Sequence, residues 1–206
     1  MEHPRKSHAE AVEHIGRYLL GTREKVLILK SKRKCCIEDY VDADFCGNWS
    51  KLRAPDDAAT AKSHTGFLIM FAGCPITWCS KLQTMVALST TEAEYIALSH
   101  SLREVIPMIQ LLDELKRRGI KTYTDEPLIH CKCFEDNSGA LEISRLPKIR
   151  PHTKHINVIY HHFRSFVMDG KVKILPIESA DQIGDVHTKP LAKGLFVKFR
   201  KLMMGW

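Results

Sequence analysis

The first half of the chain holds three segments in which apolar and polar residues alternate, a pattern that predicts β-strands. They are residues 37–45, 64–72 and 76–82. Residues 73–75 connect the second segment to the third, and so short a connection containing glycine favours a hairpin. We therefore expect the three strands to form an antiparallel meander.

Helical periodicity is prominent in the rest of the chain. Ser89 to Glu92 combine an N-cap residue with an acidic first turn. Apolar residues then recur at helical spacing up to Pro107, which we expect to end or kink the helix. The other predicted helices cover residues 7–20, 108–118, 138–144, 156–168 and 181–188, and two further strands cover 128–134 and 171–177.

The composition is that of an ordinary globular protein of 206 residues, 44% hydrophobic and 27% charged. The longest apolar stretch, residues 66–79, is interrupted by Gly73 and Pro75 and is shorter than the roughly 20 residues that a membrane helix needs. The N-terminus has no apolar signal core, and seven cysteines cannot all pair within one chain. We expect an intracellular protein with reduced thiols, cytoplasmic with the nucleus as the alternative, that contacts no membrane.

Basic residues gather at both ends of the chain. The net charge is +7; residues 1–34 carry nine Lys or Arg against four Asp or Glu, and residues 186–206 carry five against none. Basic flanks around a slightly acidic centre suit a protein that holds a polyanion while keeping carboxylates for a metal ion. A solvated basic surface explains the same charge pattern, so charge leaves both interpretations open.

Four acidic residues lie where predicted strands end or helices begin: Asp42, Glu94, Asp136 and Asp185. Carboxylates brought together repel one another and raise one another's pKa values, and a divalent cation relieves that repulsion. Hard oxygen ligands suit Mg²⁺ or Mn²⁺ rather than Zn²⁺. Taken singly, each acid is explained more simply as a surface or capping residue. The metal hypothesis therefore depends on the convergence of all four.

Five strings follow one another between residues 40 and 191: YVDADFCGN (40–48), KSHTGFLIMFAGCPITWCSKLQTMVALSTTEAEYIALS (62–99), FEDNSGAL (134–141), HTKHINVIYHHFR (152–164) and DQIGDVHTKPL (181–191). In content and order they resemble the ribonuclease H domain of copia-type LTR retrotransposon polyproteins. The resemblance implies an α/β ribonuclease H-like fold, with a five-stranded mixed sheet whose first three strands are antiparallel and which is flanked by helices.

The resemblance also implies an enzyme, an endonuclease that hydrolyses the RNA strand of an RNA–DNA hybrid with two Mg²⁺ or Mn²⁺ ions. By the family's motifs, the catalytic and metal-binding residues are Asp42, Glu94, Asp136 and Asp185. Two rival functions stay open. One is an inactive or repurposed copy that binds nucleic acid without cutting it, and the other is a recombination-type DNA nuclease of the same fold.

Glu92 competes with Glu94 for the second catalytic position, and the Ala93-Glu94-Tyr95 context matches the family better for Glu94. Glu135, next to Asp136, departs from the family's pattern. Side chains alternate along a strand, so we expect the Glu135 side chain to point away from the side on which Asp136 lies.

The segment HAEAVEHIGRYLLGT (8–22) resembles the reverse transcriptase tail of the same polyproteins. We therefore divide the chain into a reverse transcriptase tail or connecting segment, residues 1–34, and a ribonuclease H-like domain, residues 35–206. The rest of such a polyprotein is an expected partner. The polymerase motif Tyr-x-Asp-Asp is absent, because Ala43 separates the two acids of residues 40–44, and we expect no polymerase activity.

Basic side chains within the matching strings are candidates for contact with an RNA–DNA hybrid, which proteins recognise by groove shape and 2′-hydroxyl groups. The candidates are Lys154, His155, Arg164 and Lys189. Solvated surface is the alternative for these residues. A zinc site at Cys131 and Cys133 is disfavoured by their CxC spacing, and we expect one of the two to pack in the sheet core.

Overall fold

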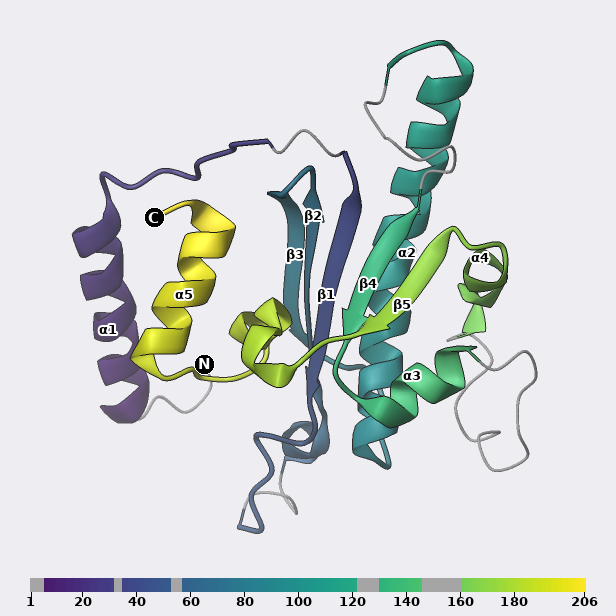
Figure 1. Cartoon of the computed structure of the whole chain (residues 1–206). Coiled ribbons are helices and arrows are strands. Elements are labelled where there is room, and N and C mark those ends of the chain that lie inside the picture. Colours follow the sequence, from purple (N-terminus) through teal and green to yellow (C-terminus); the bar gives the residue numbers. More distant parts are fainter. Residues whose placement is uncertain (1–5, 32–34, 53–56, 122–129, 146–160) are drawn as a thin grey trace.

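A five-stranded mixed sheet forms the centre of the computed structural model, which describes residues 6–31, 35–52, 57–121, 130–145 and 161–206 (Figure 1). The sheet order is β3-β2-β1-β4-β5. Strands β1, β2 and β3 pair antiparallel, whereas β1, β4 and β5 run parallel. The bounds are β1 (Ile37–Asp44), β2 (His64–Phe71), β3 (Cys74–Leu82), β4 (Cys131–Glu135) and β5 (Val172–Pro176). This sheet confirms the α/β ribonuclease H-like fold that the resemblance implies.

The predicted meander is present, and its hairpin turns through Ala72 and Gly73. Both residues have positive φ angles, 52° and 76°. Such backbone angles match the twist of the two flanking strands. Strand β3 starts at Cys74, earlier than predicted, and so includes Pro75. Proline is tolerated here because β3 is an edge strand and the register shifts at this position.

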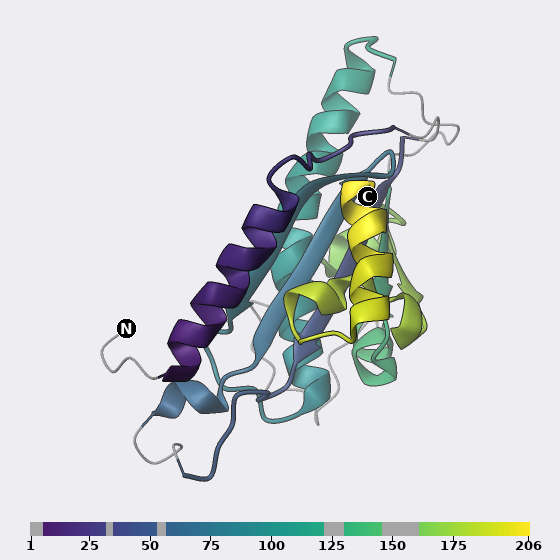
Figure 2. The same ribbon diagram turned by 90° about the vertical axis from the view of Figure 1, so that its left-hand side faces the viewer.

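Helices cover both faces of the sheet. Helix α2 lies across one face and α5 lies on the other (Figure 2), while α3 packs against α2, and α4 packs against α3 and β5. The bounds are α1 (Lys6–Thr22), α2 (Thr90–Arg117), α3 (Ser138–Arg145), α4 (Arg164–Met168) and α5 (Lys193–Met204). No helix among the described residues is long and apolar enough to cross a membrane.

Helix α2 continues through Pro107, where the sequence predicts an end or a kink, so the predicted separate helix at 108–118 is wrong. Proline lacks the N–H that would bond to the carbonyl of Arg103, four residues earlier. Both residues lie on the exposed face of the helix, where water can solvate that carbonyl. The buried face keeps its packing, and the helix therefore continues to Arg117.

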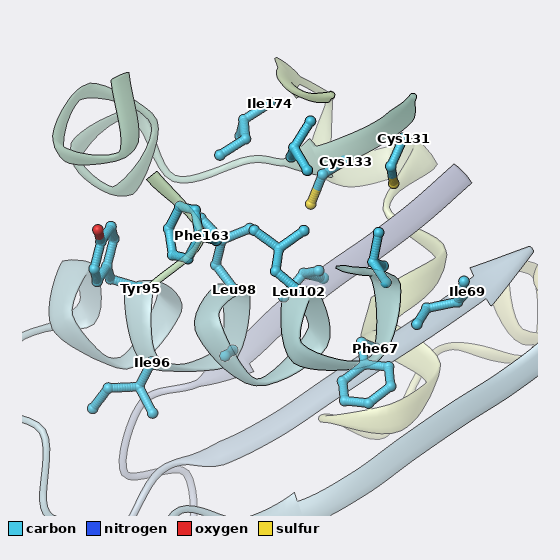
Figure 3. Close-up of a cluster of buried hydrophobic side chains, with 14 of the residues drawn as sticks. Phe67, Ile69, Tyr95, Ile96, Leu98, Leu102, Cys131, Cys133, Phe163 and Ile174 are labelled. Atoms are coloured by element: carbon cyan, nitrogen blue, oxygen red, sulfur yellow. The ribbon is translucent and has the colours of Figure 1, made fainter. Parts of the chain in front are cut away.

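The main hydrophobic core lies between α2 and the sheet. Figure 3 shows Leu98 and Leu102 of α2 beside Phe163, with Cys133 of β4 next to them. Cys131 and Cys133 are both fully buried, where the sequence predicts one of them in the core. A smaller cluster on the opposite face joins the sheet to α5 and contains Leu68, Met70, Ile183 and Phe199.

The predicted helix 156–168 lies partly outside the described residues. In its described part, the α-helix is confined to Arg164–Met168. Phe163 precedes this helix and is fully buried, with its ring centroid 5.5 Å from that of Tyr95. The helix therefore begins where the chain leaves the core.

Two more segments after β5 differ from the prediction. Residues 181–188 do not form an α-helix; the chain here makes two 3₁₀ turns, Ser179–Asp181 and Ile183–His187. Gln182 separates the turns because its backbone is extended and its side chain bonds to the sheet. Helix α5 forms where the sequence analysis predicts no element, although Leu195 and Phe199 recur at helical spacing and face the sheet.

Helix α1 forms as predicted but buries none of its residues. Its Tyr18 ring packs edge-on against Phe196 of α5, with centroids 6.2 Å apart. The chain that follows α1 runs past the end of α5, where the Ile28 N–H donates to the Met204 carbonyl at 3.1 Å. The division into segments 1–34 and 35–206 stays a prediction.

A carboxyl group lies within the core, away from the predicted catalytic residues. Asp39 of β1 is fully buried between α2 and β4. Its oxygens accept the Ser101 hydroxyl at 2.6 Å and the Cys133 thiol at 3.3 Å. Burial raises the pKa of Asp39 to about 7, and the two hydrogen bonds oppose this rise. The folded state therefore prefers Asp39 protonated.

We expect the stability of the wild type relative to Asp39→Asn to fall as the pH rises. The unfolded carboxyl releases its proton near pH 3.8 and the folded one near pH 7. Between these values the native state binds one more proton, so rising pH costs about 1.4 kcal/mol of unfolding free energy per unit, with no further loss above pH 7. Asparagine carries no such proton. Urea unfolding of both proteins from pH 4.5 to 8.5 measures the difference, with the exposed Asp169→Asn as control; parallel profiles for Asp39→Asn and the wild type would contradict it.

Candidate active site

Three of the four predicted acidic residues converge at one end of the sheet. Strands β1 and β4 are parallel, so their C-terminal ends meet at the same edge, where Asp42 and Asp136 lie. The first turns of α2 bring Glu94 to this edge. One carboxylate oxygen from each residue lies within 4.8 Å of the other two. We call Asp42, Glu94 and Asp136 the acidic trio; their catalytic role stays a prediction.

Burial makes the acidic trio unfavourable without a cation. Glu94 is 7% exposed, and no described residue donates a hydrogen bond to its Oε2. Burial raises the pKa of Glu94 strongly, and the neighbouring carboxylates raise it further, Glu135 most of all. Burial also raises the pKa of Asp42, while the hydrogen bond from Thr188 and the positive charge of Lys189 lower it. A positive ion would relieve both effects.

Glu135 also acts on this cluster, contrary to the prediction that it points away. It is fully buried on the face of β4 that packs against α2. Its Oε1 accepts the Asn137 N–H at 3.0 Å. Burial raises the pKa of Glu135 to about 8; this hydrogen bond opposes the rise and the charge of Asp136 adds to it. Strand alternation holds, but it directs Glu135 to the face on which Glu94 lies.

Gln182 holds the loop that carries Asp185 against the sheet. Its side chain is fully buried, and Nε2 donates to the carbonyls of Val41 at 2.8 Å and Phe134 at 3.3 Å. Its Oε1 accepts the Gly184 N–H at 3.2 Å. One side chain therefore joins β1, β4 and the loop next to the acidic trio.

The same loop folds back onto Asp42. The Thr188 hydroxyl donates to Asp42 Oδ2. The Lys189 Nζ lies 2.9 Å from Asp185 Oδ1 and 3.7 Å from Asp42 Oδ1. Asp185 is 4% exposed, and burial raises its pKa to about 6; the hydrogen bond from Lys189 lowers it and the charge of Asp42 raises it. Asp185 thus lies beside Asp42 of the acidic trio, through a direct side-chain hydrogen bond and through Lys189.

Sequence reasoning did not single out Gln182 or Thr188, and it assigned Lys189 to nucleic acid only. The available signal was their place in the string DQIGDVHTKPL. Ser179 was also missed, and its hydroxyl donates to Asp136 Oδ2 at 2.7 Å. Each of these residues bonds to a group far away in the sequence, so local pattern alone does not reveal its role.

Glu92 has a local role at the start of α2. Its Oε2 accepts the Leu88 N–H at 2.7 Å, and its own N–H donates to Ser89 Oγ at 3.1 Å. These bonds satisfy backbone N–H groups that a helix start leaves unpaired. The geometry therefore favours Glu94 over Glu92 as the site residue.

The predicted nucleic-acid contacts are only partly within the described structure. Lys154 and His155 lie outside the described residues. Arg164 is partly buried, and its Nη2 donates to the Ile143 carbonyl at 3.0 Å, so it joins α4 to α3. Lys189 lies among the carboxylates. Contact of these four residues with nucleic acid stays a prediction.

The acidic trio fits a hard divalent cation. Its donors are carboxylate oxygens, which Mg²⁺ and Mn²⁺ prefer, and the buried Glu94 Oε2 lacks a partner among the described residues. Among those residues it is the group of His, Cys, Asp or Glu side chains whose spacing could hold a metal ion. Cys131 and Cys133 belong instead to the hydrophobic core.

Known proteins resemble this chain over nearly its full length. It is 36% identical over 203 residues to the retrovirus-related Pol polyprotein from transposon TNT 1-94 of Nicotiana tabacum, a match that covers 98% of the chain. It is 34% identical over 199 residues to the corresponding polyprotein from transposon RE1 of Arabidopsis thaliana, and this match covers 97% of the chain. The chain is a homologue of copia-type plant Pol polyproteins.

This Pol homologue spans 14% and 12% of the length of those two relatives. No protein-family model matches it. Among solved structures, LC11-RNase H1 in complex with an RNA/DNA hybrid resembles it with a TM-score of 0.48 and 13% identity, over 74% of this chain and 93% of the other.

Proposed function

We propose that the chain is the ribonuclease H of a retrotransposon polyprotein and hydrolyses the RNA strand of an RNA–DNA hybrid. The observation that carries the proposal is the acidic trio, in which three buried or half-buried carboxylates from β1, α2 and the end of β4 meet within 4.8 Å. The homology with Pol polyproteins supports the same assignment. Asp42, Glu94, Asp136 and Asp185 are its proposed catalytic residues.

Two Mg²⁺ or Mn²⁺ ions, bound by these four carboxylates, would activate a water molecule and stabilise the leaving 3′ oxygen. The protein positions the ligands. Ser179 orients Asp136 through Oδ2, and Thr188 orients Asp42 through Oδ2. Gln182 fixes the loop of Asp185 on both neighbouring strands. Burial of Glu94 keeps water from screening its charge, which strengthens its attraction for a cation.

An RNA–DNA hybrid is the proposed partner in catalysis, and the remaining part of a Pol polyprotein is a second proposed partner. The homologues are much longer than this chain, which supports the second proposal. Lys154, His155, Arg164 and Lys189 remain the proposed contacts to the hybrid.

A cleavage assay with three substrates tests the proposed function. The whole chain is incubated with a hybrid labelled on its RNA strand, with single-stranded RNA and with duplex DNA, each in Mg²⁺, Mn²⁺ or EDTA. We expect metal-dependent cleavage of the RNA strand of the hybrid alone. A parallel preparation of Asp42→Asn controls for contaminating ribonuclease. Cleavage of duplex DNA instead would support a recombination-type nuclease, and binding of hybrid without cleavage would support an inactive copy.

A further inference from the structure

Lys189 is the one lysine that the described structure places in contact with the proposed catalytic carboxylates. Its Nζ lies 2.9 Å from Asp185 Oδ1 and 3.7 Å from Asp42 Oδ1, so a single ammonium group lies between two carboxylates from distant parts of the chain. The other oxygen of Asp42 is already used by the Thr188 hydroxyl. Lys189 is therefore a cation that bridges Asp185 and Asp42, whose carboxyl groups also interact directly.

The backbone holds Lys189 in this place. The N–H groups of Thr188 and Lys189 both donate to the Asp185 carbonyl, at 3.2 and 3.1 Å, which closes a turn directly after Asp185. This turn directs both side chains onto Asp42. Gln182 attaches the start of the same loop to the sheet. The ammonium position is thus built by the local fold rather than by a chance surface contact.

The acidic trio and the pair Asp42 and Asp185 differ in whether a positive charge already lies between their carboxylates. The acidic trio is assembled without Asp185, and no described residue donates a hydrogen bond to the buried Glu94 Oε2 or lies near it as a cation. The buried Asp185 Oδ1 also lacks a regular hydrogen bond among the described residues, but the Lys189 ammonium lies 2.9 Å from it. The pair Asp42 and Asp185 is already bridged by a positive charge. A divalent ion between these two carboxylates would lie close to the Lys189 ammonium, and the two cations would repel each other. The lysine side chain is 40% exposed, so it has a path to solvent.

We propose that Lys189 is a built-in cation which occupies the Asp42–Asp185 half of the site and which a second divalent ion must displace. The inference rests on the proposed metal site. One ion then binds at the acidic trio with Lys189 in place, and the second ion binds more weakly because it has to move the ammonium group. Lys189 acts as a positioning residue: it holds Asp185 near Asp42 until the second ion arrives.

Counting bound Mn²⁺ on the whole chain tests this order without any need for cleavage. We expect the wild type to bind one Mn²⁺ tightly and a second far more weakly. Lys189→Met removes the charge and keeps the length of the side chain, so its second Mn²⁺ should bind at least about tenfold more tightly. Lys189→Arg, which keeps the charge, should resemble the wild type. Lys193→Met, an exposed lysine at the start of α5, is the matched control and should leave both ions unchanged.

Two further measurements keep the proposal testable if Lys189→Met folds poorly. In EDTA its melting temperature should be lower than that of the wild type, and Mn²⁺ should raise it by more. In the wild type, a Mg²⁺ titration followed by NMR should shift the Lys189 side-chain signals only in the second binding step. Equal second-ion affinities in the wild type and Lys189→Met would overturn the proposal, as would Lys189 signals that do not respond to Mg²⁺.

Cleavage tests the proposed nuclease activity, whereas the Mn²⁺ binding measurements test the role of Lys189. Ordered binding with displacement of Lys189 but no cleavage of hybrid would support the lysine's role and contradict the proposed nuclease. Cleavage of hybrid by a wild type whose second ion binds as in Lys189→Met would support the nuclease and contradict the role of Lys189.

Discussion

Glu94→Gln should reduce metal-dependent cleavage of the hybrid by roughly 10²–10³-fold, the scale of removing one electrostatic group from a preorganised catalytic site. Glutamine keeps the size of the side chain but removes the charge that a divalent ion needs. Burial and the surrounding carboxylates make this charge costly without a cation, so its loss removes a strong attraction for the metal. Single-turnover cleavage of the labelled hybrid at saturating Mg²⁺ measures the loss.

Glu92→Gln is the matched control, since the two residues lie in the same first turns of α2. Glu92 caps the helix through the Leu88 N–H, and a glutamine oxygen can still accept that bond. We expect a loss of about 0.3–1 kcal/mol in unfolding free energy from the charge at the helix start, with cleavage almost unchanged. A larger loss of cleavage in Glu92→Gln than in Glu94→Gln would show that the wrong glutamate has been assigned to the site.

Asp136→Asn should abolish Mg²⁺-dependent cleavage while hybrid binding is retained. The substitution removes one of three charges in the acidic trio, and Asn can still accept the Ser179 hydroxyl through its amide oxygen. Without metal, the folded protein should be as stable as the wild type or more stable, because the charge of Asp136 raises the pKa of both Glu94 and Asp42. Gel-based cleavage, hybrid affinity in Ca²⁺ and melting in EDTA measure the three effects.

The stability readout separates this prediction from simple unfolding. Cleavage lost together with a lower melting temperature in EDTA would indicate a structural role for Asp136. Cleavage equal to that of the wild type would remove Asp136 from the site and, with it, the assignment of the acidic trio.

The strands and the acids at their ends could be predicted because both depend on local pattern. Alternation from residue 37 to 45 sets which side chains of β1 share a face, and Ser89 with Glu92 marks the start of α2. The resemblance implied a mixed sheet with its first three strands antiparallel. The structure adds the parallel pairing of β1 with β4, and that pairing brings Asp42 and Asp136 to one edge. Two of the four predicted carboxylates meet for this reason, and the first turns of α2 add Glu94 as the third.

Pro107 and Glu135 show why other expectations failed. Proline breaks a helix only when its missing hydrogen bond cannot be replaced, and its exposed position on α2 depends on how the helix packs on the sheet. Alternation correctly places Glu135 on the opposite face from its neighbours along β4. Only the packing of α2 decides that this helix covers that face. Glu135 therefore lies near Glu94 and raises its pKa.

The sequence by itself determined the order of the strands along the chain, the capped start of α2 and the identity of four acids that could meet. These features depend on neighbours within a few residues, whose geometry the backbone imposes. Only the tertiary structure decided that Gln182 joins two strands, that Thr188 bonds to Asp42, and that Lys189 lies between Asp42 and Asp185. Thr188 and Asp42 are 146 positions apart in sequence. A contact of that kind requires a distance of a few ångströms between side chains, and only the packed fold sets that distance.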